Sequence, residues 1–391
     1  LVGSEMCIRD SLYIAEMFGS IKVWTVERLG PNSYDMTASE SISSVSNILN
    51  HNDDGSPAPG VAGRLVTGMY VGGTAAQPVI WVSSSDPRIA VGEDTNLDTN
   101  SGTISRLTWN GAGWDHLDLV VGLPRSEENH VSNGIAVDEQ NGILYLAQGG
   151  HTNMGAPSNS FAYLPEYALS AAILQIDLNV IGDATYVLPT LDDPTRSDVA
   201  GGDAGDPHGG NDGQNQAMLV PGGPVQVYSP GYRNPFDVIR TDDGRIYTVD
   251  NGPNLGWGGV PVDCSHQTNE SNSNTYPDNL HFVSHQGYYG GHPNPTRGSF
   301  ANTVNGQSPI FEEDPRQCEY LAPGISDSSL AQWPFSTNGL CEYTAGNFGG
   351  SLRGDLLLAG WEGTIQRVEL SAAGDSATAV STFFSNCLLY T

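Results

Sequence analysis

The chain has 391 residues and carries 44 acidic against 15 basic residues, a formal net charge of −29. This charge argues against nucleic acid or anionic lipid as a partner, because phosphate binding needs clustered cations. The sequence contains no run of about 18 apolar residues that could span a membrane as a helix, and its length suits one large all-β domain or two ordinary domains.

Both ends of the chain resemble translated adapter sequence from environmental assemblies. Residues 1–11 read LVGSEMCIRDS and residues 387–391 read CLLYT. We therefore expect artefactual tails over 1–11 and 387–391, on either side of a single domain over 12–386. If native ends are missing, the last unit of a repeat fold should be incomplete and leave an exposed strand edge.

A strand motif recurs along the chain: LYIAEMFG, VIWVSSSD, ILYLAQGG, IYTVDNG and LLLAGWEG start at Leu12, Val79, Ile143, Ile246 and Leu356. Each is a β-rich run that ends in Gly or Asp, as a strand before a turn does. Four are followed by a second β-rich run, from Ile21, Ile104, Ala171 and Thr364. Regularly repeated hairpins predict a β-propeller, and a pair of β-sandwiches is the alternative.

The motif starts lie 64 to 110 residues apart, whereas a bare four-stranded blade takes about 40–50 residues. Insertions must fill the difference, and the Gly-, Asp-, Asn-, Ser- and Pro-rich stretches 92–101, 191–215 and 261–330 are the candidates. Helical periodicity is scarce. The best short helix candidate is PEYALSAAILQ from Pro165, which merges into a strand.

Three cysteines remain when the two ends are set aside: Cys264, Cys318 and Cys341. They allow one disulfide in three pairings with one thiol left over. No C-x-x-C occurs, so a zinc ribbon or a redox pair is not expected. We expect a secreted or periplasmic protein, with Cys264–Cys318 as the preferred pair.

A histidine lies in the loop SEENH, residues 126–130, just ahead of the strand run GIAVDEQNGILYLAQ. Histidine has the one side-chain pKa already near neutrality, so His130 could act as a general base, with the acidic neighbours orienting it. A loop histidine is more often a surface or hydrogen-bonding residue, and that alternative stays open.

Two further loops carry candidate chemistry. Residues 201–216, GGDAGDPHGGNDGQNQ, place Asp203, Asp206 and Asp212 among glycines, and such oxygen-rich loops can hold calcium. Their spacing matches no EF-hand, so a solvated loop is the preferred interpretation. Residues 285–298, HQGYYGGHPNPTRG, combine aromatic and polar groups that suit sugar recognition and rigid turns equally.

The segment 228–259 is the most informative one in the chain. Arg233, in an Arg-Asn pair, is a planar donor fork suited to a carboxylate. The Gly252-Pro253 step is a place where backbone carbonyls can turn toward a hard cation. An anion clamp and a carbonyl cluster joined by a hairpin indicate an anionic cofactor with a metal, and an ordinary propeller hairpin is the alternative.

Together these segments resemble the soluble quinoprotein glucose/sorbosone dehydrogenase family, whose members are six-bladed β-propellers that use pyrroloquinoline quinone (PQQ) and calcium. The resemblance is densest at GLPRSEENHVSNGIAVD, at YSPGYRNPFDV with VDNGPN, and at GYYGGHPNPTR, in the family's order. It implies an all-β, six-bladed propeller with long loop insertions. With native ends missing, we expect this propeller to be incomplete at the terminal blade.

The resemblance also assigns roles to individual residues. His130 matches the base that removes the hydroxyl proton as hydride leaves for the quinone. Arg233 and Asn234 match the pair that contacts the quinone oxygens. Gly252 and Pro253 match the residues whose carbonyls hold calcium. The implied partners are a sugar substrate and an electron acceptor.

Some positions depart from the family pattern. Asn129 stands where the family's glucose enzyme has an acidic neighbour of the base, and we group it with the cofactor contacts. The family's cofactor-binding lysine falls in a strand resembling LLLAGWEGTIQRVEL, where this chain has Trp361-Glu362, and Lys22 is the only lysine. Arg64, in GRLVTGMYVG, occupies the region of another cofactor contact and could replace a lost cation.

The sequence therefore predicts PQQ- and calcium-dependent oxidation of an aldose-type sugar by hydride transfer, with a histidine base. One alternative is a non-catalytic propeller that binds carbohydrate or protein and has lost the quinone. A second is a calcium-dependent, lactonase-like propeller hydrolase, which would need side-chain carboxylates and amides that converge on calcium.

Overall fold

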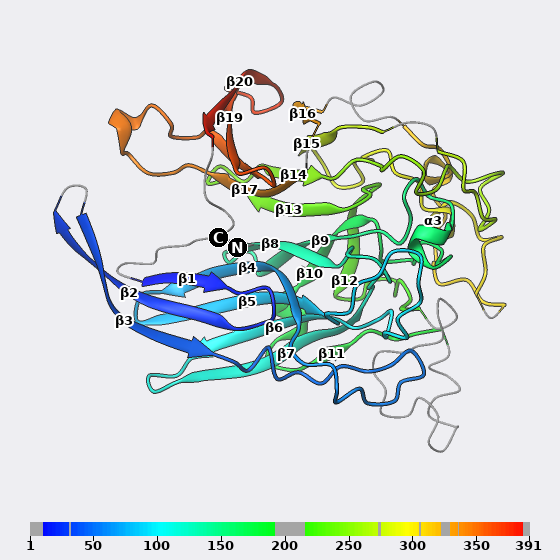
Figure 1. The fold of residues 1–391 in the computed structure, drawn as a ribbon, viewed down its shortest axis with the longest axis horizontal. Coiled ribbons are helices and arrows are strands. Elements are labelled where there is room, and N and C mark those ends of the chain that lie inside the picture. Colours follow the sequence, from blue (N-terminus) through cyan, green and yellow to red (C-terminus); the bar gives the residue numbers. More distant parts are fainter. Residues whose placement is uncertain are drawn as a thin grey trace.

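The computed structural model describes residues 11–30, 33–191, 216–272, 275–304, 306–321, 329–334 and 336–385. Within these residues the chain forms five β-sheets, with only a few short helices (Figure 1). No helix in the described ranges is long and apolar enough to cross a membrane. The predicted calcium loop 201–216 lies outside the described residues except for its last position.

The first two sheets come from the N-terminal third of the chain. The first contains β1 (Ser11–Ala15), β2 (Ile21–Gly30) and β3 (Ser33–Ile42). The second contains β4 (Leu65–Thr74), β5 (Gln77–Ser85), β6 (Gly102–Trp109) and β7 (Trp114–Leu123). The short strand β11 (Tyr186–Val187) pairs in parallel along β7, so it widens the second sheet to five strands.

Three four-stranded sheets follow. The third contains β8 (Ser132–Asp138), β9 (Ile143–Gln148), β10 (Ala172–Asp177) and β12 (Val225–Pro230). The fourth contains β13 (Pro235–Arg240), β14 (Ile246–Asp250), β15 (Asp278–Val283) and β16 (Ala331–Trp333). The fifth contains β17 (Thr337–Glu342), β18 (Leu356–Gly360), β19 (Thr364–Leu370) and β20 (Ala377–Phe384). The helical turns are α1 (Leu178–Ile181), α3 (Pro295–Gly298), η1 (Asn159–Phe161), η2 (Pro315–Cys318) and η3 (Phe348–Gly350).

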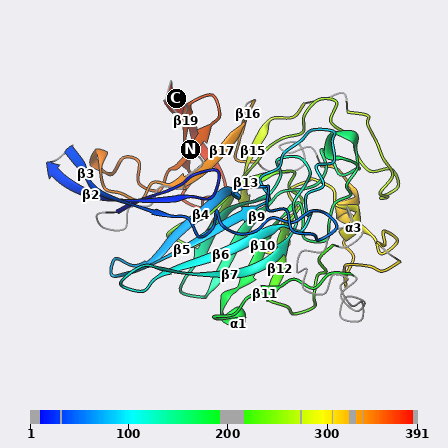
Figure 2. The ribbon, with the colours of Figure 1, turned by 60° about the horizontal axis from the view of Figure 1, so that its bottom comes forward.

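The five sheets are the blades of a β-propeller. The first strands of successive sheets, β1, β4, β8, β13 and β17, contact one another in that order. The later strands of each sheet follow outward from them (Figure 1, Figure 2). Antiparallel blades arranged around their first strands are the defining feature of this fold, so the prediction of an all-β propeller with loop insertions is confirmed.

The blade count differs from the prediction. The described residues form five blades where the resemblance implied six, and the propeller is incomplete in that sense. The last blade was expected to be incomplete or poorly paired, but within the described residues it has four strands, and its exposed outer strand β20 pairs along its length with β19. The three-stranded blade is the first one. In it the recurring motif forms the first strand, β1, whereas in the other blades the motif forms the second strand.

All five copies of the recurring motif are strands, one per blade, because each combines β-branched or aromatic residues with a turn signal. The helix candidate from Pro165 was wrong. Residues 165–171 form no helix. The apolar run that follows them is strand β10, whose side chains are mostly buried. The stretch 261–330 is not wholly an insertion either, because it contains the blade strand β15.

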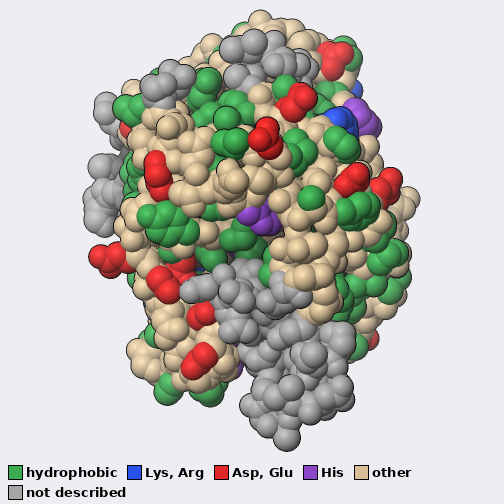
Figure 3. Space-filling model, turned by 90° about the vertical axis from the view of Figure 1, so that its right-hand side faces the viewer, with side chains coloured by type: hydrophobic (Ala, Val, Ile, Leu, Met, Phe, Trp, Pro, Cys, Tyr) green, Lys and Arg blue, Asp and Glu red, His purple; other side chains and the backbone are tan. Residues whose placement is uncertain are grey.

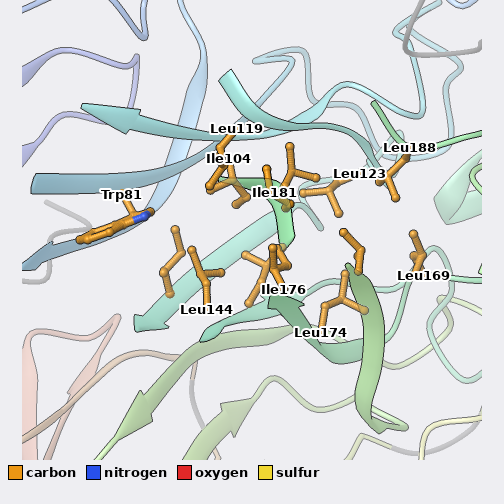
Figure 4. Packing of buried hydrophobic residues seen from close by; sticks show 14 of the residues in the cluster. Trp81, Ile104, Leu119, Leu123, Leu144, Leu169, Leu174, Ile176, Ile181 and Leu188 are labelled. Atoms are coloured by element: carbon orange, nitrogen blue, oxygen red, sulfur yellow. The ribbon is translucent and has the colours of Figure 1, made fainter. Parts of the chain in front are cut away.

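The largest hydrophobic core lies between the second and third blades (Figure 4). Ile104 and Leu119 reach it from the second blade, and Leu144 and Leu174 reach it from the third; all four are completely buried. Burying one such side chain contributes about 1.5–3 kcal/mol. This packing fixes the ends of β7, β8 and β9, and therefore the loops that begin there.

The long loops gather at one end of the propeller. In an antiparallel blade, the connections that leave the second and fourth strands emerge at the same end. The loops 86–101, 124–131, 149–171, 231–234 and 251–277 are all of this kind and lie at the right-hand end of Figure 1. The sequence motifs singled out above are therefore brought together by the topology.

The predicted disulfide joins Cys264 and Cys318, with an S–S distance of 2.06 Å. It links the loop after β14 to the long connection between β15 and β16. Gly298 lies against it, because a Cβ there would be 2.7 Å from the Cys318 sulfur. Cys341 lies in β17 with its side chain exposed.

Asp237 lies where three of the first strands meet. Its carboxyl group accepts hydrogen bonds from the N–H of Leu340 in β17 and of Val238, both at 2.9 Å. It also lies against Gly134 of β8, where a Cβ would be 2.1 Å from Oδ1. Burial raises the pKa of Asp237 to about 7, so part of the population holds a neutral carboxyl group at neutral pH.

We expect Asp237→Asn to change the melting temperature more favourably at pH 8 than at pH 4. A carboxyl group whose pKa is raised by folding costs stability as the pH rises from about 4 through the folded-state value. Asparagine removes the charge and keeps one acceptor oxygen, for Leu340, but loses the acceptor for Val238 at every pH. Thermal unfolding of both proteins from pH 4 to pH 8 measures the difference. An equal effect at every pH, or a pH-dependent gain in the exposed control Asp115→Asn, would contradict this account.

Candidate active and cofactor site

His130 ends a tightly closed loop before β8. The N–H of Ser126 donates to the His130 carbonyl at 3.1 Å, and the N–H of His130 donates to Ser126 Oγ at 3.2 Å. The guanidinium group of Arg125 is completely buried and donates to the carbonyls of Ser126 and Glu128 in the same loop. A buried cation surrounded by carbonyl oxygens therefore holds the loop in place.

The hydrogen bonds of His130 define its protonation. Its Nδ1 lies 2.8 Å from the Gly150 carbonyl, so Nδ1 carries the proton and Nε2 keeps a lone pair. Burial lowers the pKa of His130 well below its usual value, and the charge of Arg233 lowers it further. Nε2 lies 3.6 Å from a carboxyl oxygen of Glu128. The ring is therefore neutral at neutral pH, oriented, and able to accept a proton at Nε2.

Two glycines after β9 let the base approach the Arg-Asn pair. A Cβ on Gly149 would lie 3.0 Å from Asn234 Oδ1 and 3.0 Å from the His130 Cβ. A Cβ on Gly150 would lie 2.9 Å from the Arg233 carbonyl, which accepts the Gly150 N–H at 2.8 Å. No larger residue fits here without moving the base or the pair.

Asn234 is held by the protein on all sides. Its N–H donates to Asp250 at 2.8 Å, its Oδ1 accepts from Asn133 at 2.9 Å, and its Nδ2 donates to Asn251 at 3.1 Å. These bonds join the third and fourth blades. The structure therefore places Asn234 beside the base, with its amide engaged in supporting the site.

The side chain of Arg233 is held by one hydrogen bond only among the described residues. Its Nε donates to Asn153 Oδ1 at 3.0 Å, and the same oxygen accepts the N–H of Asn254 at 2.9 Å. The two terminal nitrogens of Arg233 have no hydrogen-bond partner among the described residues, although the side chain is only 5% exposed. Asn153 was not singled out from the sequence. It follows the recurring strand motif, but its partners come from loops about 100 residues away.

The base and the guanidinium group lie against the same aromatic ring. The His130 ring is 5.0 Å from the centroid of Phe161, and Arg233 Cζ is 6.0 Å from it. The two groups are therefore at most about 11 Å apart, which is within the span of a cofactor-sized pocket. The structure brings these two predicted site residues together, and their chemical roles stay predictions.

A buried carboxylate supports the loop that carries Gly150 and Asn153. Glu166 accepts hydrogen bonds from His151 N–H at 3.0 Å, Thr152 Oγ at 2.6 Å, Ser170 Oγ at 2.5 Å and His292 Nε2 at 2.9 Å. Burial alone would raise its pKa, but the His292 hydrogen bond and the nearby charges lower the pKa of Glu166 to about 2. His292 belongs to the stretch 285–298, so this stretch helps to hold the loop that carries Gly150 and Asn153.

The Gly252-Pro253 turn is fixed by Asp278. The N–H of Gly252 donates to Asp278 at 2.9 Å, and the Pro253 carbonyl accepts the N–H of Tyr276 at 3.4 Å. The Gly252 carbonyl has no donor within the described part of the chain. Those same residues contain no group of three or more His, Cys, Asp or Glu side chains that could hold a metal. A cation at this turn would therefore depend on backbone carbonyls.

Arg64 is not brought to this cluster. It is completely buried and its guanidinium group donates to Asn50 at 2.8 Å, to the Ser84 carbonyl at 3.4 Å and to the Ser101 carbonyl. These bonds tie β4 to the following strands of the second blade. All three of its nitrogens are engaged, so Arg64 has a structural role here, not that of a spare cation.

Asn129 is exposed and faces its neighbour Glu128. With its amide oriented as a donor, the Asn129 nitrogen lies 2.5 and 3.1 Å from the two Glu128 oxygens. Burial raises the pKa of Glu128, and the charge of Arg233 opposes this.

A second group missed from the sequence is Tyr320, whose hydroxyl is buried and has no hydrogen-bond partner among the described residues. Burial raises the pKa of Tyr320, and the charge of Arg233 opposes this increase.

The loop end of the propeller is shown in Figure 3. On its described part a histidine side chain lies in a hollow near the centre, and acidic side chains are scattered around it. Basic side chains are few there, as the composition of the chain requires. Any anionic ligand must therefore rely on buried cations such as Arg233, because the surrounding surface does not attract it.

No protein-family model matches the sequence, and no curated protein matches it. Solved structures do match. The chain is 17% identical to a crystal structure of a glucose dehydrogenase, with a TM-score of 0.50, covering 96% of this chain and 84% of that one.

Two other matches have a TM-score of 0.49. The holo PQQ domain of pyranose dehydrogenase from Coprinopsis cinerea is 13% identical, covering 96% of this chain and 78% of that one. The apo soluble aldose sugar dehydrogenase from Escherichia coli is 12% identical, covering 96% and 82%. At such identities only the fold is shared, and the chain has the propeller fold of a solved glucose dehydrogenase.

We expect Gly150→Ala to destabilise the protein by about 1–3 kcal/mol, the usual cost of overpacking a filled site. The added methyl group would meet Glu166 Oε1 at 2.8 Å and the Arg233 carbonyl at 2.9 Å. Neither can move without breaking buried hydrogen bonds. Chemical denaturation measures the loss. Gly113→Ala is the control, since a Cβ there meets nothing within 4 Å. Equal stability of the two variants would disprove the close approach.

Proposed function

We propose that this protein is a PQQ- and calcium-dependent dehydrogenase that oxidises an aldose-type sugar. One observation carries the proposal: the hydrogen bond from His130 Nδ1 to the Gly150 carbonyl, at 2.8 Å, leaves Nε2 as a base beside Arg233. The propeller fold shared with a solved glucose dehydrogenase supports it. Fold alone does not establish chemistry, so the proposal rests on the site.

The residues of the candidate site fit an anionic quinone with calcium in part. Arg233 offers two donors without partners, the Tyr320 hydroxyl is a further donor, and the Gly252 carbonyl is a ligand for a hard cation. The only lysine, Lys22, bonds Ser41 at the exposed β2–β3 pair and adds nothing here. Arg233 would therefore be the main cation for the carboxylates of the cofactor.

The chain's own part in the reaction is proton transfer and orientation. When bound, the quinone would supply the hydride acceptor, and calcium would act on it as a Lewis acid. His130 Nε2 takes the proton of the reacting hydroxyl group. The imidazolium ion that forms is stabilised by the Gly150 carbonyl at Nδ1 and by Glu128 at 3.6 Å from Nε2. Arg233, whose side chain is held by Asn153, would bind the anionic groups of the cofactor.

The low pKa of His130 has a consequence for the pH profile. Because burial keeps the ring neutral, the base is already unprotonated throughout the neutral range. Protonation would remove activity only below the lowered pKa of His130. The proposal therefore includes a turnover rate that protonation of the base does not change near neutral pH. An exposed histidine base with a pKa of about 6.5 would instead make the rate fall there.

The remaining parts of the proposal concern setting and partners. The sugar passes its electrons through the cofactor to a separate electron acceptor. We place the protein outside the cytoplasm, secreted or periplasmic, because the Cys264–Cys318 disulfide persists in an oxidising compartment. The runner-up is a non-catalytic propeller that binds carbohydrate or protein. The single lysine and the burial of His130 and Arg233 favour it.

Titration of the purified protein with PQQ in the presence and absence of calcium tests the cofactor. We expect saturable binding that requires calcium and that weakens in Arg233→Gln by about ten- to a hundred-fold, the worth of a charge-assisted contact. Quinone absorbance follows binding, and dye reduction with a panel of aldoses follows turnover. No binding at millimolar calcium would leave the non-catalytic propeller as the better account.

We expect His130→Ala to lower turnover by roughly 10²–10⁴-fold and to change PQQ binding little, because the base acts in proton transfer. The matched control is His285→Ala, which removes an exposed loop histidine that contacts Ser284. Steady-state kinetics with the best aldose measures both variants. Unchanged turnover in His130→Ala would assign His130 to a purely structural role.

A further inference from the structure

Phe161 is the residue that both candidate functional groups contact. Its ring is completely buried, 5.0 Å from the His130 ring, 6.0 Å from Arg233 Cζ and 6.1 Å from the Trp257 ring. It ends η1, a short turn in the loop after β9. The ring therefore covers the base and the guanidinium group, which are 2% and 5% exposed.

Arg233 differs from the other buried arginines of the described chain. Arg64, Arg125 and Arg297 each donate to several carbonyl oxygens. The terminal nitrogens of Arg233 have no acceptor within the described residues, and its guanidinium group faces the ring of Phe161. The charges of Glu128, Asp250 and Asp278 act favourably on this guanidinium group, but neither they nor the cation–π contact gives its terminal N–H groups a hydrogen-bond acceptor. These donors are placed for acceptors that a ligand would bring.

The Phe161 segment is tied to the loop after β14 and, through the Gly92 N–H to the Ser160 carbonyl at 3.3 Å, to the loop after β5, and not to the blade strands. Ser158 Oγ donates to the Trp257 carbonyl at 2.6 Å, and the N–H of Asn159 donates to Glu270 at 3.0 Å. Just after the ring, Ala162 and Tyr163 have φ angles of 51° and 62°. Non-glycine residues take this left-handed conformation at a cost. The cover is therefore a separate and strained piece of chain laid over a site fixed by the blades.

We propose that the ring of Phe161 occupies the place of a ligand's aromatic part, in a site for planar aromatic anions. The ligand ring would lie against His130 in place of Phe161, and its anionic oxygens would receive the terminal nitrogens of Arg233. The Tyr320 hydroxyl is a further donor to those oxygens. This inference rests on the site of the proposed function and adds that the cofactor binds only when Phe161 leaves.

Benzoate is the simplest probe, because it combines a phenyl ring with one carboxylate. In Phe161→Ala the lost ring leaves a ring-sized cavity beside His130 and Arg233, and cavities left by lost side chains can take up small aromatic molecules. We expect saturable benzoate binding to Phe161→Ala by calorimetry and none to the unchanged protein at the same concentrations. Benzyl alcohol, which lacks the charge, should bind ten- to a hundred-fold more weakly, since it forms no charge-assisted contact with Arg233.

Each other result overturns the proposal. Equal affinity of Phe161→Ala for benzoate and benzyl alcohol would show that there is no anion site. Equal benzoate binding to the variant and the unchanged protein would show that Phe161 does not block the site. If Phe161→Ala does not fold, Ser158→Ala keeps the Phe161 side chain but removes one tether of its segment, the hydrogen bond to the Trp257 carbonyl, so that the ring can leave more easily. That variant should then bind benzoate where the unchanged protein does not, and its failure to do so would also overturn the proposal.

PQQ binding separates this inference from the proposed function. If PQQ binds the unchanged protein, Phe161→Ala should bind it more tightly, because the ring no longer competes. Weaker binding to the variant would mean that Phe161 is a fixed stacking platform, which overturns the cover and leaves the function standing. Benzoate binding to Phe161→Ala with no PQQ binding to either protein would keep the cover and remove the function.

Discussion

The backbone of Gly150 connects the two halves of the candidate site. Its carbonyl accepts from His130 Nδ1 and its N–H donates to the Arg233 carbonyl, both at 2.8 Å. The two peptide groups that meet at the Gly150 Cα therefore fix the tautomer of the base and the position of the arginine backbone. Glu166 anchors the residues that follow it. If the backbone on both sides of Gly150 rotated, the base would lose its orientation and the Arg-Asn pair would lose its neighbour.

The arrangement of the blades was accessible from the sequence, since the signal for each blade is local. A run such as IYTVD becomes β14 because its β-branched and aromatic residues suit a strand buried on both faces, whatever lies elsewhere in the chain. The number of blades was not accessible in this way. It was taken from a resemblance, and the first blade shows why that fails: its motif strand β1 is present without the preceding strand seen in the other blades.

The supporting residues of the site were out of reach for a different reason. Asn153, Glu166 and Phe161 act through partners 80 to 126 residues away in other loops, or through a ring contact to another blade. Nothing in the local sequence distinguishes them from ordinary loop residues. Arg64 shows the opposite error, because an arginine in a suitable region carried no sign that Asn50 and Ser101 saturate it. Residue type indicates what a group can do, and only its neighbours decide whether it is available.

Two structural layers meet at the site, and they have different origins. The blade ends supply His130, Gly150 and Arg233, whose positions follow from core packing between neighbouring blades. The loops after β9, β14 and β15 supply Phe161, Trp257 and Tyr320, and the Cys264–Cys318 disulfide ties the last two loops together. Chemistry that needs alignment is thus carried by the rigid layer. Access to it is decided by the loop layer, which can change its side chains without disturbing the hydrogen bonds that orient the base.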